Sequence, residues 1–142
     1  MKIFAPLFLS TALFATAFAP AFSLTASAQT AEDISVEDVA ALVSEHADLL
    51  ILDVRTSGEW DGGHMEDAAW IDFLEDDFST EASRIAKDRP LLIYCAAGGR
   101  SANAMKALAR SGFTHLYNLE GGFYAWQDAG KAVSKSKPVK IR

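Results

Sequence analysis

The sequence predicts an α/β fold built on an open, mainly parallel β-sheet. Two continuous apolar runs, at residues 49–54 and 90–95, have the length and composition of strands that are buried on both faces. Segments with helical spacing of apolar residues separate these strands from each other and from a third strand near residue 115. Strands that alternate with helices along a chain are typical of a parallel sheet covered by helices.

The first 28 residues are not expected to belong to this domain. Lys2 is followed by a long uncharged apolar stretch that ends in the small residues of an ASA motif. A basic start, an apolar centre and an A-x-A site form the pattern of a secretory signal peptide. A membrane anchor is the alternative, but two prolines and several hydroxyl residues interrupt the apolar stretch. We therefore predict cleavage after Ala28, export, and a periplasmic location in a bacterium.

The remaining 114 residues have room for one domain with one core. Lys2 is the only charged residue before position 29, so the remainder carries 12 basic and 19 acidic residues, a net charge of −7. Nine of the acids fall within residues 59–81, which argues against a nucleic-acid partner. Residues 131–142 hold five basic residues and no acid. We predict a domain at 29–130, a mobile basic tail at 131–142, and no membrane contact after cleavage.

The helices and strands follow from local patterns. Ser35 is a suitable N-cap for a helix within 35–46. A second helix is expected at 99–112, where Gly112 provides its C-terminal stop. Three glycines within residues 55–64 indicate a loop. The other elements expected are strands at 49–54, 68–72, 90–95 and 115–119, a polar helical region at 73–88 with a break near Ser79, and a short helix at 121–130.

The predicted sheet places two chemically active segments on one rim. Ligands of open parallel sheets lie beyond the carboxyl ends of the strands. Asp53 and Cys95 each stand at the end of a predicted buried strand. We therefore expect their side chains to face the same region.

Cys95 is the only cysteine in the chain, so no internal disulfide can form. Arg100 follows it after four small residues, Ala96, Ala97, Gly98 and Gly99. A short glycine loop at the start of a helix points its N–H groups inward and forms an anion cradle. Such a setting lowers a cysteine pKa and supplies a thiolate nucleophile, while Arg100 adds planar donors for an oxyanion. The alternative to a reactive thiol is a buried cysteine that ends a core strand, with the glycines forming an ordinary turn between strand and helix.

Three stretches of the chain resemble single-domain rhodaneses, which are sulfurtransferases. They are LILDVRTSGEWDGGH, LLIYCAAGGRS and HLYNLEGGFYAWQDAG, in that order along the chain. The resemblance implies a rhodanese-like, five-stranded open sheet with helices on both faces. It also implies that Cys95 takes sulfur from a donor such as thiosulfate, forms a persulfide, and passes the sulfur to cyanide or a thiol. A protein thiol is a further acceptor of this kind, and no cofactor is implied.

The resemblance assigns roles to individual residues. Cys95 is the nucleophile, residues 96–100 form the cradle, and Arg100 binds the oxyanion and positions the loop. Asp53, Arg55 and Glu59 are expected to brace the rim by ion pairing. The chain departs from the family in its uncharged Ala96 and Ala97, and in Asp67, which stands where the family has glycine.

Two other functions stay open at this level. A Cys-dependent phosphatase or arsenate reductase uses a similar loop, but that family resemblance implies five residues between Cys and Arg, against four here. A non-catalytic module that carries or senses sulfur, or docks a partner, would also retain Cys95. His64 is expected to make a structural hydrogen bond, and the spacing of the histidines predicts no metal site.

Overall fold

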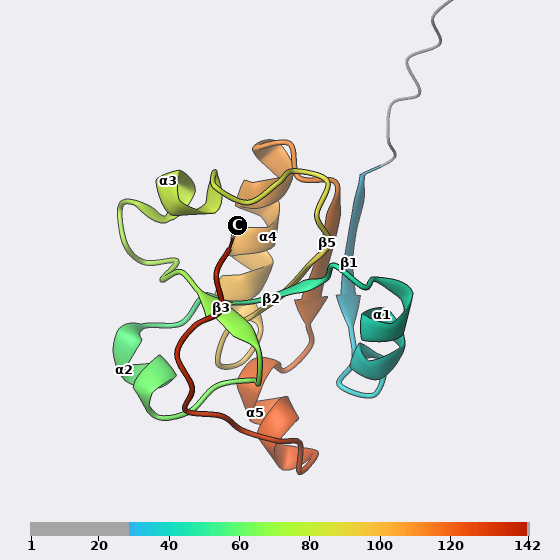
Figure 1. Cartoon of the computed structure of the whole chain (residues 1–142), viewed down its shortest axis with the longest axis vertical. Helices are drawn as coiled ribbons and strands as arrows, with labels where there is room; N and C mark the ends of the chain where they lie inside the picture. Colours follow the sequence, from blue (N-terminus) through green and yellow to red (C-terminus); the bar gives the residue numbers. More distant parts are fainter. Residues whose placement is uncertain (1–28, 142) are drawn as a thin grey trace, which may run out of the picture.

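The computed structural model describes residues 29–141, which form a five-stranded sheet with helices on both faces (Figure 1). All strand pairs are parallel, and the strand order is β1-β5-β4-β2-β3. The strands are β1 (Thr30–Ile34), β2 (Leu50–Asp53), β3 (Ala68–Trp70), β4 (Leu91–Tyr94) and β5 (His115–Leu119). The helices are α1 (Val39–Glu45), α2 (Ser57–Asp61), α3 (Phe78–Ala82), α4 (Gly99–Arg110) and α5 (Gly122–Asp128). The expected α/β fold is confirmed, while the expected signal peptide lies outside the described residues.

Strand β4 shows how the two layers of core divide between the faces of the sheet. Leu91 and Ile93 pack with α3 and α4, whereas Leu92 and Tyr94 pack with α1, α2 and α5. All four side chains of β4 are fully buried, which explains why this segment reads as an unbroken apolar run. The strand ends at Tyr94, directly before Cys95, so the sheet fixes the start of the loop that contains Cys95.

Several element boundaries differ from the sequence-based expectations. Strand β1 was not predicted, and α3 spans five residues of a longer expected helical region. Helix α1 begins at Val39 because a turn precedes it, in which the Ser35 hydroxyl donates to the carboxylate of Asp38 and accepts from its N–H. The predicted loop at 55–64 contains α2, which begins after a capping box. Its signal is Thr56 followed by Glu59 three residues later.

The expectation of a mobile C-terminal tail is wrong for residues 134–141, which we call the C-terminal strap. Ser134 exchanges backbone hydrogen bonds with His64, and the N–H of Val139 donates to the carbonyl of Ala68 in β3 at 3.1 Å. Val139 and Ile141 pack against the core. The backbone of this segment passes alongside β3 on its way to the C-terminus (Figure 1). The lysines of this segment stay in water while its apolar residues hold it to the domain. Among residues 29–141, no helix has the length and apolar character needed to cross a bilayer.

Candidate active site

The loop that follows β4 is held by the backbone of the neighbouring helix α5. The carbonyl of Cys95 accepts a hydrogen bond of 2.8 Å from the N–H of Phe123, and that of Ala96 accepts one of 3.0 Å from Tyr124. Both donors lie at the start of α5. The first residues of the loop are therefore fixed by main-chain contacts that do not depend on charge.

The sulfur of Cys95 lies among hydrogen-bond donors. Its Sγ accepts from the N–H of Gly98 at 3.1 Å and from the hydroxyl of Ser101 at 3.5 Å. Burial alone would raise the pKa of this thiol. Hydrogen bonds from the hydroxyl and N–H of Ser101 and from two loop N–H groups outweigh that effect, so the pKa of Cys95 is lowered. The donors around Sγ thus shift the pKa of the thiol in the direction that favours the thiolate.

Gly121 and Gly122 bring α5 close enough to support the loop. A Cβ atom on Gly122 would lie 2.4 Å from the carbonyl oxygen of Cys95 and 2.8 Å from that of Ala96. The φ angle of Gly122 is +57°, a region that side chains disfavour. Only glycine permits this approach. The pair is visible in the sequence, but sequence reasoning assigned it no role beyond the family resemblance, and it also missed Ser101.

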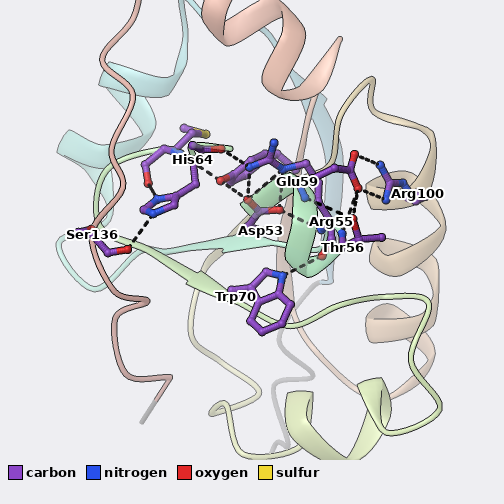
Figure 2. Close-up of polar contacts among 11 residues, drawn as sticks. Asp53, Arg55, Thr56, Glu59, His64, Trp70, Arg100 and Ser136 are labelled. Atoms are coloured by element: carbon purple, nitrogen blue, oxygen red, sulfur yellow. Dashed lines mark hydrogen bonds and ion pairs between the residues drawn. The ribbon is translucent and has the colours of Figure 1, made fainter. Parts of the chain in front are cut away.

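A buried ion pair lies under the loop. The guanidinium of Arg55 donates to both carboxylate oxygens of Asp53, with a shortest distance of 2.7 Å, and to the carbonyl of Gly63 at 2.8 Å (Figure 2). The hydroxyl of Tyr94 donates to Asp53 at 2.6 Å. Burial, together with the Asp53 charge, raises the pKa of Tyr94, so this hydroxyl stays protonated. The guanidinium also lies 4.1 Å from the ring centre of Phe123.

A second ion pair joins α2 to the start of α4 at the surface. Arg100 donates to the two carboxylate oxygens of Glu59 at 2.8 and 2.6 Å (Figure 2). The hydrogen bonds from Arg100 lower the pKa of Glu59 to about 2, and those from Thr56 act in the same direction. The same contact raises the pKa of Arg100. The structure therefore brings Glu59 and Arg100 together as expected for bracing, but the planar donors of Arg100 face Glu59 and not the cradle.

His64 has the structural place expected for it. Its side chain is buried, its ring stacks on Trp60 with 3.5 Å between centroids, and its two nitrogens lie 2.9 Å from the carbonyl oxygens of Met65 and Ser136. The ring thereby ties the rim to the C-terminal strap (Figure 2). Trp70 likewise serves packing and positioning, because its indole N–H donates to the carbonyl of Arg55 at 2.8 Å. Across 29–141, no three His, Cys, Asp or Glu residues are grouped to hold a metal ion.

A strand that ends in an activated cysteine, followed by a glycine cradle and a helix, is a site for covalent chemistry on a small group. The model of the rhodanese-like domain matches residues 35–129. The chain belongs to the rhodanese-like family. Rhodanese-like relatives include a protein named sulfurtransferase from Allochromatium vinosum, 33% identical over 101 residues, which cover 71% of this chain and 92% of the relative. The thiosulfate sulfurtransferase GlpE of Shewanella oneidensis is 31% identical over 87 residues, 61% of this chain and 84% of GlpE.

Solved structures agree with this assignment. A rhodanese-like domain protein from Staphylococcus aureus is 28% identical, with a TM-score of 0.64, and the match covers 75% of this chain and 99% of that structure. A protein of Rhodopseudomonas palustris, described as a possible tyrosine phosphatase, is 27% identical with a TM-score of 0.61. The match covers 73% of this chain and 85% of that structure. The rhodanese-like fold therefore hosts more than one suggested chemistry.

Proposed function

We propose that this protein is a sulfurtransferase that moves a sulfane sulfur from a donor such as thiosulfate to a thiophilic acceptor through a persulfide on Cys95. The observation that carries the proposal is the set of donors around Sγ, which lowers the pKa of the thiol. The sulfurtransferase names of relatives at about one-third identity support it.

The two half-reactions balance without a cofactor. The Cys95 thiolate attacks the outer sulfur of thiosulfate, the bond between the two thiosulfate sulfurs breaks, and sulfite leaves with the electron pair. Cyanide or a thiolate then attacks the outer sulfur of the persulfide and releases the Cys95 thiolate. The loop N–H groups that face Sγ would also stabilise the persulfide anion. Such a mechanism predicts ping-pong kinetics.

The donor is proposed to bind through the loop backbone. Arg100 is engaged by Glu59, and the loop residues 96–99 carry no charge. Cys95 is only 2% exposed, so a donor must reach the sulfur through the cradle. In this proposal Arg100 acts mainly as a positioning residue that fixes the start of α4, and Asp53, Arg55 and Glu59 support the rim.

Intact mass spectrometry after incubation with thiosulfate tests the proposal. We expect one added sulfur on Cys95, its removal by cyanide, and neither event in the folded variant Cys95→Ser. A parallel phosphatase assay separates the two enzyme classes. Phosphate ester hydrolysis without sulfur loading would overturn the proposal, and stable loading with no discharge to cyanide or to thiols would favour a carrier over an enzyme.

We also propose that residues 1–28 direct export to the bacterial periplasm and are removed, leaving a domain that begins near residue 29. The support is the sequence pattern alone: a basic start, an uncharged apolar stretch and an ASA site. N-terminal mass analysis of the protein from a periplasmic extract is expected to show Gln29 as the first residue. A periplasmic form that retains Met1 would contradict this.

A further inference from the structure

A groove opens beside the active-site loop. It has a volume of about 1000 Å³ and lies between β3, α3 and the C-terminal strap. Trp70 and Ile71 form one apolar wall, and Val139 and Ile141 of the strap form the other. This volume is at the upper end of about 300–1000 Å³ for small-molecule sites. The groove therefore has room for several residues of a polypeptide.

The rim of the groove is acidic. Asp72, Glu75, Asp77 and Glu81 line it. Two basic residues, Arg84 and Lys140, also line the groove. Arg84 is paired with Glu81 at 2.7 Å, so Lys140 is the one basic lining residue among those described that can balance the other three acids. Glu75 and Asp77 are exposed, and neither makes an ion pair with any residue in the described part of the chain. An apolar groove with an unbalanced acidic rim complements a ligand that is both cationic and apolar.

The groove reaches the active site without including it. None of the residues from Cys95 to Arg100 is among those that line it. Ser57, the first residue of α2, lines the groove and follows Thr56, whose hydroxyl donates to Glu59 at 2.8 Å. Glu59 in turn pairs with Arg100 at 2.6 Å, so this end of the groove adjoins the outer ion pair. A ligand lying in the groove would therefore contact the rim that holds Arg100 without occupying the cradle itself.

We propose that this groove docks the sulfur acceptor, and that the acceptor is a polypeptide whose Lys- or Arg-bearing apolar segment lies in the groove and presents a thiol to Cys95. This inference rests on the proposed sulfurtransferase function. Thiosulfate is an anion, so an acidic groove does not suit the donor. A basic acceptor is attracted to it, and the four consecutive strap residues that line it, 138–141, suit contact with an extended segment.

The transfer step within the docked complex is a thiolate displacement. The acceptor thiolate attacks the outer sulfur of the Cys95 persulfide, and a new sulfur–sulfur bond forms on the acceptor. The original bond to Sγ breaks, and its electron pair returns to Cys95 as thiolate. No outside oxidant or reductant is required.

Binding is tested first with a probe that cannot react. The probe is a nine-residue peptide of alternating Lys and Leu with one central Ser, and its matched control has Glu in place of each Lys. The variant Glu75→Gln/Asp77→Asn removes two groove charges. The variant Asp61→Asn/Asp76→Asn removes two exposed acids that do not line the groove. We expect the groove variant, and not the control variant, to bind the basic peptide about fivefold more weakly at low salt.

Transfer is tested with the same peptides carrying Cys in place of Ser, in single-turnover discharge of preloaded Cys95 persulfide. We expect faster discharge by the basic peptide than by the acidic one, and an approximately fivefold loss of that rate in the groove variant. Discharge by cyanide, which needs no groove, should stay unchanged. Equal binding and equal discharge by the two peptides, or equal effects of the two double variants, would overturn the docking proposal. Failure to load sulfur on Cys95 would instead overturn the proposed function, and the Ser peptide would still decide whether the groove binds a basic segment.

Discussion

Two carboxylate–arginine pairs flank the same loop, and they differ in almost every physical respect. The Asp53–Arg55 side chains are 0% and 4% exposed, whereas those of Glu59 and Arg100 are 32% and 27% exposed. The buried pair has further partners in Tyr94 and the carbonyl of Gly63. The outer pair has Thr56.

The two pairs therefore have different roles: the buried pair stabilises the fold, and the outer pair positions the loop. The buried pair supports the fold, because loss of either partner would leave the other charge buried without a counter-charge. An exposed pair contributes little stability, since water competes for both charges. Its value here is positional, because it joins α2 to the first turn of α4, where the cradle ends. Stability and activity should therefore respond differently to changes at the two pairs.

Asp53→Asn should have the largest effect on stability. It leaves the Arg55 guanidinium buried without a counter-charge, and we expect a loss of about 3–5 kcal/mol in the free energy of unfolding. Urea unfolding measures this. Tyr94→Phe is the matched control, since it keeps the ion pair and removes the hydroxyl that donates to Asp53 and accepts from the N–H of Met65, and it should cost about 1–3 kcal/mol. A loss below that of Tyr94→Phe would contradict the structural role of the buried pair.

Gly122→Ala tests whether the main-chain contacts from α5 contribute more to the position of the loop than the outer ion pair does. The new Cβ would clash with the carbonyl oxygens of Cys95 and Ala96. Alanine also disfavours the positive φ angle of this position. We expect a stability loss of about 1–3 kcal/mol and at least about a tenfold loss of thiosulfate:cyanide activity. Gly58→Ala is the control, because Gly58 lies outside the cradle, has no positive φ, and its Cβ would meet no atom within 4 Å. Similar activity in both variants would show that the close approach of α5 does not position the cradle.

Arg100→Lys should reduce the activity of the protein while leaving its stability nearly unchanged, if the outer pair mainly positions the loop. Lysine keeps the charge but cannot make the two-pronged contact with Glu59. We expect the free energy of unfolding to change by no more than about 1 kcal/mol. Catalytic efficiency should fall several-fold, with a slower rate of Cys95 alkylation near neutral pH. An unchanged alkylation rate together with full activity would show that the pair does not position the loop.

The smallest expected effect is the pH dependence of the outer pair. The pKa of Glu59 is lowered from 4.5 to about 2, chiefly by Arg100. Its contribution to stability is therefore fully present above pH 4.5 and is lost as the pH falls toward 2. Because the pair is partly exposed, we expect no more than about 1 kcal/mol. The difference in unfolding free energy between the native protein and Glu59→Gln should shrink from pH 7 to pH 3, and a difference that grows would reverse the assigned sign.

The elements that sequence reasoning found are those whose patterns are set by burial. Strand β4 is apolar throughout and β2 is apolar up to its last residue, Asp53, because helices cover both faces of these strands. Strand β1 was missed because its sequence, TAEDI, belongs to an exposed sheet edge with three exposed central residues. The C-terminal strap was mistaken for a mobile tail because its two anchors, Val139 and Ile141, are scattered among lysines.

The candidate site was predictable as a set of residues but not as a set of contacts. Cys95 and its glycine loop could be recognised from the sequence, because the strand end, the loop and the start of the helix follow one another directly in the chain. It could not show that Arg100 turns toward Glu59, which lies 41 positions earlier in the chain. The support from Gly122 and the hydroxyl of Ser101 depends on tertiary approach in the same way. Helix α2 is different, because its Thr56–Glu59 capping box was present in the sequence and was overlooked among glycines.

The pairing of β1 with β5 places the first strand against the last one, with Asp33 and Asn118 joined across 85 residues. At about 5–20 residues per second, a ribosome needs on the order of ten seconds to supply the partner after the first strand has emerged. Closing so long a loop is entropically costly, and folds dominated by distant pairings reach the native state slowly. The emerging chain therefore has an extended period without a finished sheet, in which β1 has no partner strand.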